Sequence, residues 1–270
     1  MTKPLISIII PNYNSGSYLE RAINSVFDQT FSDWELIIVD NNSNDESRVV
    51  VENIQHSKIS TYKIENNGII AASRNLAIKK SKGKWLAFLD ADDWWRPDKL
   101  TKALPLLCDY DLLYHNMYLV YSESNLHDRI TRCRILDQSV FSDLLLSGNT
   151  LVTSSVVVRK RLFCEIGMFR EEREYRAWED YDAWLRLAEK NVRFKLIAKP
   201  MGYFWQGGDS TLTTRLITRN TSLFKVIYRK KIEKDISGRL WWCDYTMSLC
   251  HLSLDKIDLA FKYSQRSLLK

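Results

Sequence analysis

Residues 85–93 read Trp-Leu-Ala-Phe-Leu-Asp-Ala-Asp-Asp and carry the clearest structural signal in the chain. The apolar run 85–89 has the length and composition of a strand that is buried on both faces. Two carboxylates, Asp90 and Asp92, follow it directly, with only Ala91 between them. Because ligands of open α/β sheets bind beyond the carboxyl ends of the strands, this stretch predicts a strand that leads into a binding site.

Three more strand-like segments precede this one. Residues 6–10 and 35–39 are apolar and are followed by polar clusters, whereas residues 60–64 form a weaker strand signal. Between these segments, apolar residues from 19 to 27 follow helical spacing, and residues 69–80 also read as a helix. Such an alternation of strands and helices predicts a parallel sheet with right-handed crossovers, whose polar clusters meet at one edge.

Two further helix signals lie in this half of the chain. Ser17 and Glu20 have the spacing of a capping box, which would open the first helix. Residues 96–107 can form the helix that follows the acidic triplet, residues 90–92.

The remainder of the chain is less regular and ends in a stretch that reads as mostly helical. The elements expected there are, in order, a strand over 112–120, a helix over 140–146, a strand over 154–158, a helix opened by Asp180, and helices over 214–234, around 241–252 and over 257–269. The sequence therefore predicts an α/β fold with a C-terminal helical extension.

The composition is that of an ordinary globular protein. The chain has 270 residues, 45% of them hydrophobic and 27% charged, which excludes wholesale disorder. Its longest apolar runs fall far short of the ~20 residues of a membrane-spanning helix, and its start lacks the anatomy of a signal peptide. Five Cys and four His are scattered, so we expect no zinc site, no disulfide framework and a cytoplasmic location.

The positive charge is concentrated in one segment, residues 219–239. Seven basic residues face two acidic ones there, which supplies most of the net charge of +6. Apolar neighbours, among them Ile227 and Tyr228, favour an interfacial helix on the anionic cytoplasmic face of a membrane. A solvated helix face that covers the rest of the protein remains an equal alternative. Because no known nucleic-acid motif accompanies the segment, we expect no nucleic-acid partner.

The acidic triplet has the chemistry of a divalent-cation site. Asp90 and Asp92 can both reach one cation, and hard oxygen ligands suit Mg²⁺ or Mn²⁺ bridging a diphosphate. The alternative is an acidic turn in which Asp93 caps the next helix.

Residues after the other strands could bind a nucleotide. Asp40 can accept hydrogen bonds from a nucleobase or a ribose, and Pro11 and Tyr13 can offer backbone groups and an aromatic face. Arg74, after the turn at 66–68, could reach a phosphate or order the acidic loop, by which we mean residues 90–93. Each has a plainer alternative: a helix cap for Asp40, a strand stop for Pro11 and a solvated helix position for Arg74.

Residues 178–180, Trp-Glu-Asp, form a second candidate site. A carboxylate at a helix start, beside an aromatic ring, can take a proton from a sugar hydroxyl. The alternative is that Glu179 and Asp180 only complement the helix dipole.

Taken together, these residues resemble the pattern of glycosyltransferase family 2, whose fold is called GT-A. The resemblance covers about residues 5–212 and is carried by the motifs at 7–14, 35–40, 67–68, 73–75, 85–93 and 178–180. It implies a Rossmann-like, mostly parallel mixed sheet flanked by helices. It also divides the chain into a catalytic domain at 1–212, with a nucleotide-sugar half at 1–105 and an acceptor half at 106–212, and a helical extension at 213–270.

The resemblance also implies an activity. Such enzymes of the bacterial surface-polysaccharide type, as in O-antigen synthesis, move a hexose or N-acetylhexosamine from a nucleotide sugar, usually a UDP-sugar. The acceptor is a hydroxyl of a glycan or lipid-linked saccharide, and the anomeric centre is inverted. Asp180 matches the general base, and Asp92 the contact to Mn²⁺ or Mg²⁺, with Asp90 beside it. The nucleotide-sugar contacts implied are Pro11, Tyr13, Asp40, Asn67, Arg74, Asp90, Ala91 and Asp92, and the acceptor contacts are Trp178, Glu179 and Ser154.

Two positions depart from the family pattern. Asn41 stands where many relatives have a second Asp, and Gln206 stands where many have a His. Gln206 can bond a phosphate but is a poor metal ligand, so either the metal relies on Asp92, phosphates and water, or cation dependence is weaker than usual.

Two other functions remain open at this level. A non-catalytic nucleotide-binding or scaffold protein would keep the fold but need not keep Asp90, Asp92 and Asp180 together. A nucleotidyl transferase would favour a basic, glycine-rich phosphate loop after the first strand, and residues 12–16 contain no Arg or Lys. Product analysis separates the three.

Overall fold

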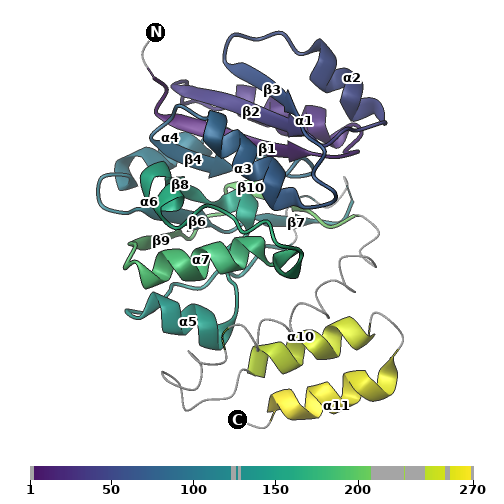
Figure 1. The fold of residues 1–270 in the computed structure, drawn as a ribbon. Coiled ribbons are helices and arrows are strands. Elements are labelled where there is room, and N and C mark those ends of the chain that lie inside the picture. Colours follow the sequence, from purple (N-terminus) through teal and green to yellow (C-terminus); the bar gives the residue numbers. More distant parts are fainter. Residues whose placement is uncertain are drawn as a thin grey trace.

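The computed structural model describes residues 3–122, 126, 129–207, 228, 241–252 and 256–268. Its centre is a mixed sheet in the order β3-β2-β1-β4-β8-β6-β9 (Figure 1). The strands of this sheet are β1 (Ile6–Asn12), β2 (Trp34–Asp40), β3 (Ile59–Lys63), β4 (Trp85–Phe88), β6 (Leu112–His115), β8 (Val157–Arg159) and β9 (Phe194–Ile197).

The sheet is parallel in its first half and mixed in its second. Strand β1 pairs in parallel with β2 and β4, and β2 with β3. Strand β8 runs antiparallel to both β4 and β6, and β6 pairs in parallel with β9. A smaller sheet has the order β5-β10-β7, from β5 (Trp94–Trp95), β10 (Gly202–Trp205) and β7 (Tyr118–Val120). This is the GT-A architecture that the sequence predicts.

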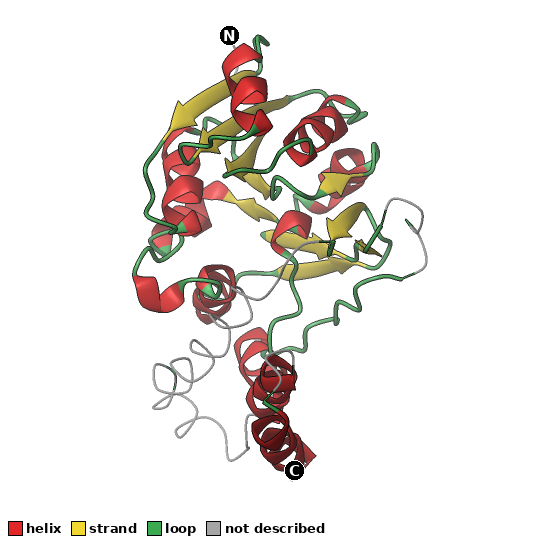
Figure 2. Ribbon diagram, turned by 90° about the vertical axis from the view of Figure 1, so that its right-hand side faces the viewer, coloured by secondary structure: helices red, strands yellow, loops and turns green. Residues whose placement is uncertain are grey.

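Helices cover both faces of the large sheet (Figures 1 and 2). The α-helices are α1 (Tyr18–Phe27), α2 (Glu46–Asn53), α3 (Ile70–Lys80), α4 (Lys99–Ala103), α5 (Val140–Ser147), α6 (Lys160–Glu165), α7 (Glu179–Glu189), α10 (Trp241–Leu252) and α11 (Ile257–Leu268). Short 3₁₀ turns are η1 (Leu104–Leu106), η2 (Thr153–Ser155) and η3 (Arg173–Tyr175).

The apolar strands are buried because both of their faces are covered. Along β1, Ile8 and Ile10 join a core cluster with α1, α2 and α4, whereas Ile9 joins a second cluster with α3, α5, α6 and α7. Successive side chains of a strand point to opposite faces, so a continuous apolar run is what a doubly covered strand requires.

Four sequence predictions of local structure were wrong. Ser17 lies in a helical conformation and makes no capping bond, whereas Asp45 caps α2 by accepting from the Ser47 N–H. The helix over 96–107 is shorter, because Pro105 has no N–H to continue α4 and the chain tightens into η1. The strand over 112–120 is two strands in different sheets, and that over 154–158 begins as η2.

The C-terminal helices α10 and α11 lie side by side beyond α5 (Figures 1 and 2). They confirm the helices expected around 241–252 and over 257–269. The Trp242 ring N–H donates to the Leu145 carbonyl at 2.8 Å, which ties α10 to α5. The helix expected over 214–234 lies outside the described residues, except for Tyr228, and the division at residue 212 stays a prediction. Among the described helices, none combines the length and apolarity that crossing a bilayer requires.

Candidate active site

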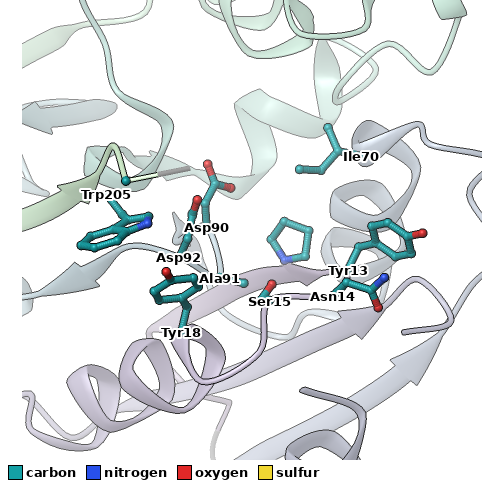
Figure 3. A pocket seen from close by; sticks show the side chains of 11 residues that line it. Tyr13, Asn14, Ser15, Tyr18, Ile70, Asp90, Ala91, Asp92 and Trp205 are labelled. Atoms are coloured by element: carbon teal, nitrogen blue, oxygen red, sulfur yellow. The ribbon is translucent and has the colours of Figure 1, made fainter. Parts of the chain in front are cut away.

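A cavity of about 450 Å³ opens where β1 and β4 end (Figure 3). Residues 13–15 approach it from the loop after β1, and Asp90 and Asp92 from the loop after β4. Its lining is Pro11, Tyr13, Asn14, Ser15, Tyr18, Ile70, Asp90, Ala91, Asp92, Trp205 and Gly207. The predicted residues after these two strands therefore share one cavity.

A smaller cavity of about 200 Å³ shares Pro11, Tyr13 and Ile70 with the first. It is more apolar and adds Asn12, Asn41, Asn66, Gly68, Ser73 and Arg176. Arg176 comes from the loop before α7, and its guanidinium lies so close to Gly68 that a Cβ there would meet it at 3.0 Å. No pattern in the sequence points to this residue, because it reaches the smaller cavity from the far half of the chain.

Asp40 lies beneath the surface at the end of β2. Its carboxylate accepts from the Asn12 amide at 2.6 Å and from the Ser43 hydroxyl and N–H at 2.6 and 3.0 Å. With 1% of its surface exposed, Asp40 fastens the loops after β1 and β2 to each other. Its predicted contact with a nucleotide stays a prediction.

The turn before α3 requires left-handed backbone. Asn67 has φ 51° and Gly68 φ 76°, conformations that Asn and Gly tolerate best. The Asn66 side chain supports the turn by accepting from the Gly68 N–H and by donating to the Ser73 hydroxyl. Asn66 and Gly68 of this turn line the smaller cavity, whereas Asn67 is exposed and is not among the residues that line either cavity.

Arg74 bridges the two candidate sites. Its guanidinium donates to Asp90 at 2.6 Å and to Glu179 at 2.8 Å, and its side chain is 4% exposed. The paired carboxylates keep the Arg74 pKa above its usual value despite burial. Of the roles expected for Arg74, ordering the acidic loop is the one that this geometry provides.

Asp92 shares the cavity with Asp90. Desolvation in the cavity, followed by the neighbouring Asp90 carboxylate, raises the pKa of Asp92 to about 6, although the side chain keeps contact with solvent. Arg21 donates to the Asp92 carbonyl at 3.1 Å, and its guanidinium lies 3.6 Å from the centre of the Trp94 ring. Arg21 thus supports the acidic loop from α1.

Asp93 does not cap the next helix. Its carboxylate accepts from the Trp205 N–H at 2.9 Å and is fully buried, so it joins the acidic loop to β10. Burial and the nearby carboxylates of Asp92 and Asp90 raise the pKa of Asp93 well above its usual value.

Asp180 lies in the first turn of α7, next to Glu179. It accepts from the Thr153 hydroxyl at 2.8 Å and from the Tyr181 N–H at 2.6 Å. Burial raises the pKa of Asp180, while the Thr153 hydrogen bond and the Arg74 charge oppose this rise. A carboxylate in this setting has the properties of a general base.

The predicted acceptor contacts have different surroundings. Trp178 precedes α7 and its ring packs near those of Tyr181 and Trp242. Glu179 is buried against Arg74. Ser154 is fully buried, and its hydroxyl accepts from the Asp90 N–H at 3.0 Å. Ser154 therefore has no surface for an acceptor, and we infer a structural role for it instead.

Gln206 follows β10 between two residues that line the cavity, Trp205 and Gly207. Its N–H donates to the Val120 carbonyl at 2.8 Å, and its side chain is exposed. The bond from the neighbouring Trp205 N–H to Asp93 places this position close to the acidic loop.

A divalent cation fits this site only with ligands from the substrate. Within the described part of the chain, no group of three or more His, Cys, Asp or Glu side chains could hold a metal. Asp90 and Asp92 nevertheless supply hard oxygen atoms, and desolvation raises the pKa of Asp92, with repulsion by the Asp90 carboxylate adding to the rise. A cation shared with diphosphate oxygens would relieve that repulsion.

Comparison with curated proteins identifies relatives that are described as glycosyltransferases. The chain is 39% identical over 109 residues to the Bacillus subtilis protein described as putative teichuronic acid biosynthesis glycosyltransferase TuaG, covering 40% of this chain and 43% of that protein. It is 29% identical over 187 residues to Escherichia coli WfgD, described as a UDP-Glc:alpha-D-GlcNAc-diphosphoundecaprenol beta-1,3-glucosyltransferase, covering 69% and 71%. An uncharacterized glycosyltransferase of Rickettsia prowazekii is 32% identical, and the chain spans 58% of its length.

Solved structures share the fold. S. aureus TarS 1-349 in complex with UDP aligns with a TM-score of 0.61 at 20% identity, covering 97% of this chain and 73% of that one. The mannosyltransferase PcManGT of Pyrobaculum calidifontis, solved with GDP-Man and Mn²⁺, aligns with a TM-score of 0.59 at 16% identity, covering 99% and 76%. The model of the family described as glycosyl transferase family 2 matches residues 7–163. More than half of the chain is included in this match, and the chain therefore belongs to glycosyl transferase family 2.

Proposed function

We propose that this protein is an inverting glycosyltransferase that moves a hexose or N-acetylhexosamine from a UDP-sugar to a hydroxyl of a glycan or lipid-linked saccharide. The observation that carries the proposal is the double ion pair of Arg74. It joins Asp90 of the donor-side cavity to Glu179, the residue beside the candidate base Asp180. A donor bound at Asp90 and a base beside Glu179 would be kept at a fixed separation by this bridge, as a direct displacement needs.

The substrate classes follow the names of the relatives. The WfgD description contains a UDP-sugar donor and a diphosphoundecaprenol acceptor, and TarS was solved with UDP and with UDP-GlcNAc. The smaller cavity, which is the more apolar of the two, suits a nucleoside. The larger cavity, with Asp90 and Asp92, suits the diphosphate and sugar.

The reaction we propose has one step at the anomeric carbon. The acceptor oxygen attacks from the face opposite the diphosphate, Asp180 takes the hydroxyl proton, and the bond from the anomeric carbon to the diphosphate oxygen breaks. The nucleoside diphosphate leaves with the bonding electrons, so no covalent enzyme intermediate forms. Mg²⁺ or Mn²⁺ held by Asp92 and Asp90 would offset the negative charge on the departing diphosphate.

Product analysis tests this proposal. An α-linked UDP-sugar should give a β-glycoside, and Asp180→Asn should lower kcat by roughly 10²–10⁴-fold, as expected when a general base is lost. A product with retained configuration, or near-normal turnover by Asp180→Asn, would contradict the mechanism. A folded protein that binds UDP but forms no glycosidic bond with any donor and acceptor would favour the scaffold alternative.

Membrane attachment through residues 219–239 belongs to the proposal as well, on the cytoplasmic face of the inner membrane. A lipid-linked acceptor would make such attachment useful. One residue of the segment is corrected by the structure: Tyr228 is buried, and its hydroxyl donates to Asp182 of α7 at 2.8 Å. Tyr228 therefore packs against the catalytic domain and does not contact lipid.

A further inference from the structure

Two adjacent hydroxyl side chains in η2 contact both halves of the candidate active site. Thr153 donates to the Asp180 carboxylate at 2.8 Å, and Ser154 accepts from the Asp90 N–H at 3.0 Å. Both side chains are buried, with 7% and 0% of their surface exposed. One short turn therefore bonds directly to the candidate base and to the acidic loop.

Two buried side chains hold the backbone of this turn in place. The Ser154 carbonyl accepts from the Lys99 amino group at 3.0 Å and from the Trp95 ring N–H at 2.8 Å. Lys99 is 1% exposed, and its amino group lies 3.4 Å from the centre of the Trp95 ring. Burial lowers the pKa of Lys99 well below its usual value, and a buried amino group is costly unless it donates, so this bond ties Lys99 to the backbone of the turn.

The bond from Thr153 also restricts the orientation of the Asp180 carboxylate. One oxygen, Oδ2, accepts from Thr153, while Oδ1 accepts from the Tyr181 N–H. An ionised carboxylate has about four lone-pair sites, so two are occupied and the others keep a defined direction. Without Thr153, the carboxylate could turn about its Cβ–Cγ bond.

We propose that Thr153 is the positioning residue of the catalytic base, and that Thr153 and Ser154 together set the distance between this base and the donor-binding loop. The proposal rests on the proposed glycosyl transfer. It assigns distinct effects to neighbouring hydroxyls: the Thr153 hydroxyl serves proton transfer, whereas the Ser154 hydroxyl serves donor binding.

The test compares single variants by steady-state kinetics and by titration with UDP and Mn²⁺. Thr153→Val removes the hydroxyl but keeps the shape, and should lower kcat by about 10- to 100-fold, the range expected for a hydrogen bond to a charged group, with donor KM and UDP affinity unchanged. Thr153→Ser should restore kcat to within about threefold. Ser154→Ala should instead weaken UDP binding.

Ser155→Ala is the matched control, because the Ser155 hydroxyl donates to the Val152 carbonyl and not to Asp180 or Asp90. It should resemble the wild type. If Thr153→Val does not fold, Thr153→Ala compared with Thr153→Ser makes the same test.

Two results would overturn the positioning role. One is a Thr153→Val enzyme with wild-type kcat while Asp180→Asn is inactive, which would leave the proposed function intact. The other is an equal loss of kcat in Thr153→Ser and Thr153→Val, which would mean that the hydroxyl is not what matters. If Asp180→Asn is fully active, the proposed function itself fails.

Discussion

At the scale of the residue, the most informative side chain is Arg74. From the sequence alone, a single Arg on a helix is usually solvated, whereas here it is buried and forms two ion pairs. Its partners lie 16 and 105 positions away in the chain. No local pattern could predict the second contact, because only the folded sheet brings α7 beside α3.

Arg74→Met should lower the free energy of unfolding by about 3–5 kcal/mol, because it leaves the buried Glu179 and the partly buried Asp90 without their cation. The free energy of unfolding of Arg74→Lys should lie between those of Arg74→Met and the wild type, since an ammonium lacks the fork that spans both acids. Urea unfolding measures the effect. The exposed pair Arg48–Glu52 provides the control, because Arg48→Met should cost less than about 1 kcal/mol. Equal costs at the two positions would contradict the bridging role.

The rate of transfer should depend on the ionisation of Asp180. A general base works only when deprotonated, and burial raises the pKa of this carboxyl above the value of about 3.9 for a free aspartate. As the pH falls through the raised pKa, kcat should therefore fall, about tenfold per unit. The profile of kcat against pH at saturating substrates should show an acid limb with a midpoint above about 3.9. A rate that stays constant down to that pH would exclude Asp180 as the base.

At the scale of the element, periodicity predicted the strands well and the helix ends poorly. The strands at the centre are apolar on both faces, so their signal is continuous in the sequence. Helix caps depend on a single side-chain rotamer and on the loop in front of it. Ser17 has a capping sequence but makes no capping bond, whereas Asp45, which has no Glu or Gln three positions later, caps α2.

This difference can be measured. Asp45 accepts from the Ser47 N–H at 3.1 Å and from the Gly16 N–H at 2.7 Å, so it fastens the start of α2 to the loop after β1. Asp45→Ala should therefore destabilise the fold by about 1–2 kcal/mol. Ser17→Ala should cost less than about 0.5 kcal/mol, because no capping bond is lost. Thermal or urea unfolding of the two variants measures these costs. A larger cost for Ser17→Ala than for Asp45→Ala would contradict the capping assignment.

At the scale of the whole molecule, the sequence predicted the fold class and the edge of the sheet that carries the site. It did so because three strands end in polar residues and parallel strands bring these ends together. The contacts that cross between the halves were not predictable in the same way. Irregular segments of the second half position Arg176, which lines the smaller cavity, and Thr153, which donates to Asp180.

The concentration of charge in residues 219–239 has a consequence for the intact protein. Replacing Lys230, Lys231 and Lys234 by Gln should reduce flotation with anionic liposomes, because each cation near such a surface contributes about 1 kcal/mol. Neutral liposomes serve as the control. Flotation that these replacements leave unchanged would remove this segment as the attachment site and favour its alternative role as a cover of the catalytic domain.

The central claim is that the cavity between Tyr13 and Asp92 binds the donor nucleotide with the help of a divalent cation. Calorimetric titration of the full chain with UDP, with and without Mn²⁺, tests it most directly, with GDP, dTDP and CMP as comparisons. We predict that Mn²⁺ strengthens UDP binding and that Asp92→Asn abolishes this enhancement. Absence of binding to any nucleotide by a protein shown to be folded would contradict the claim.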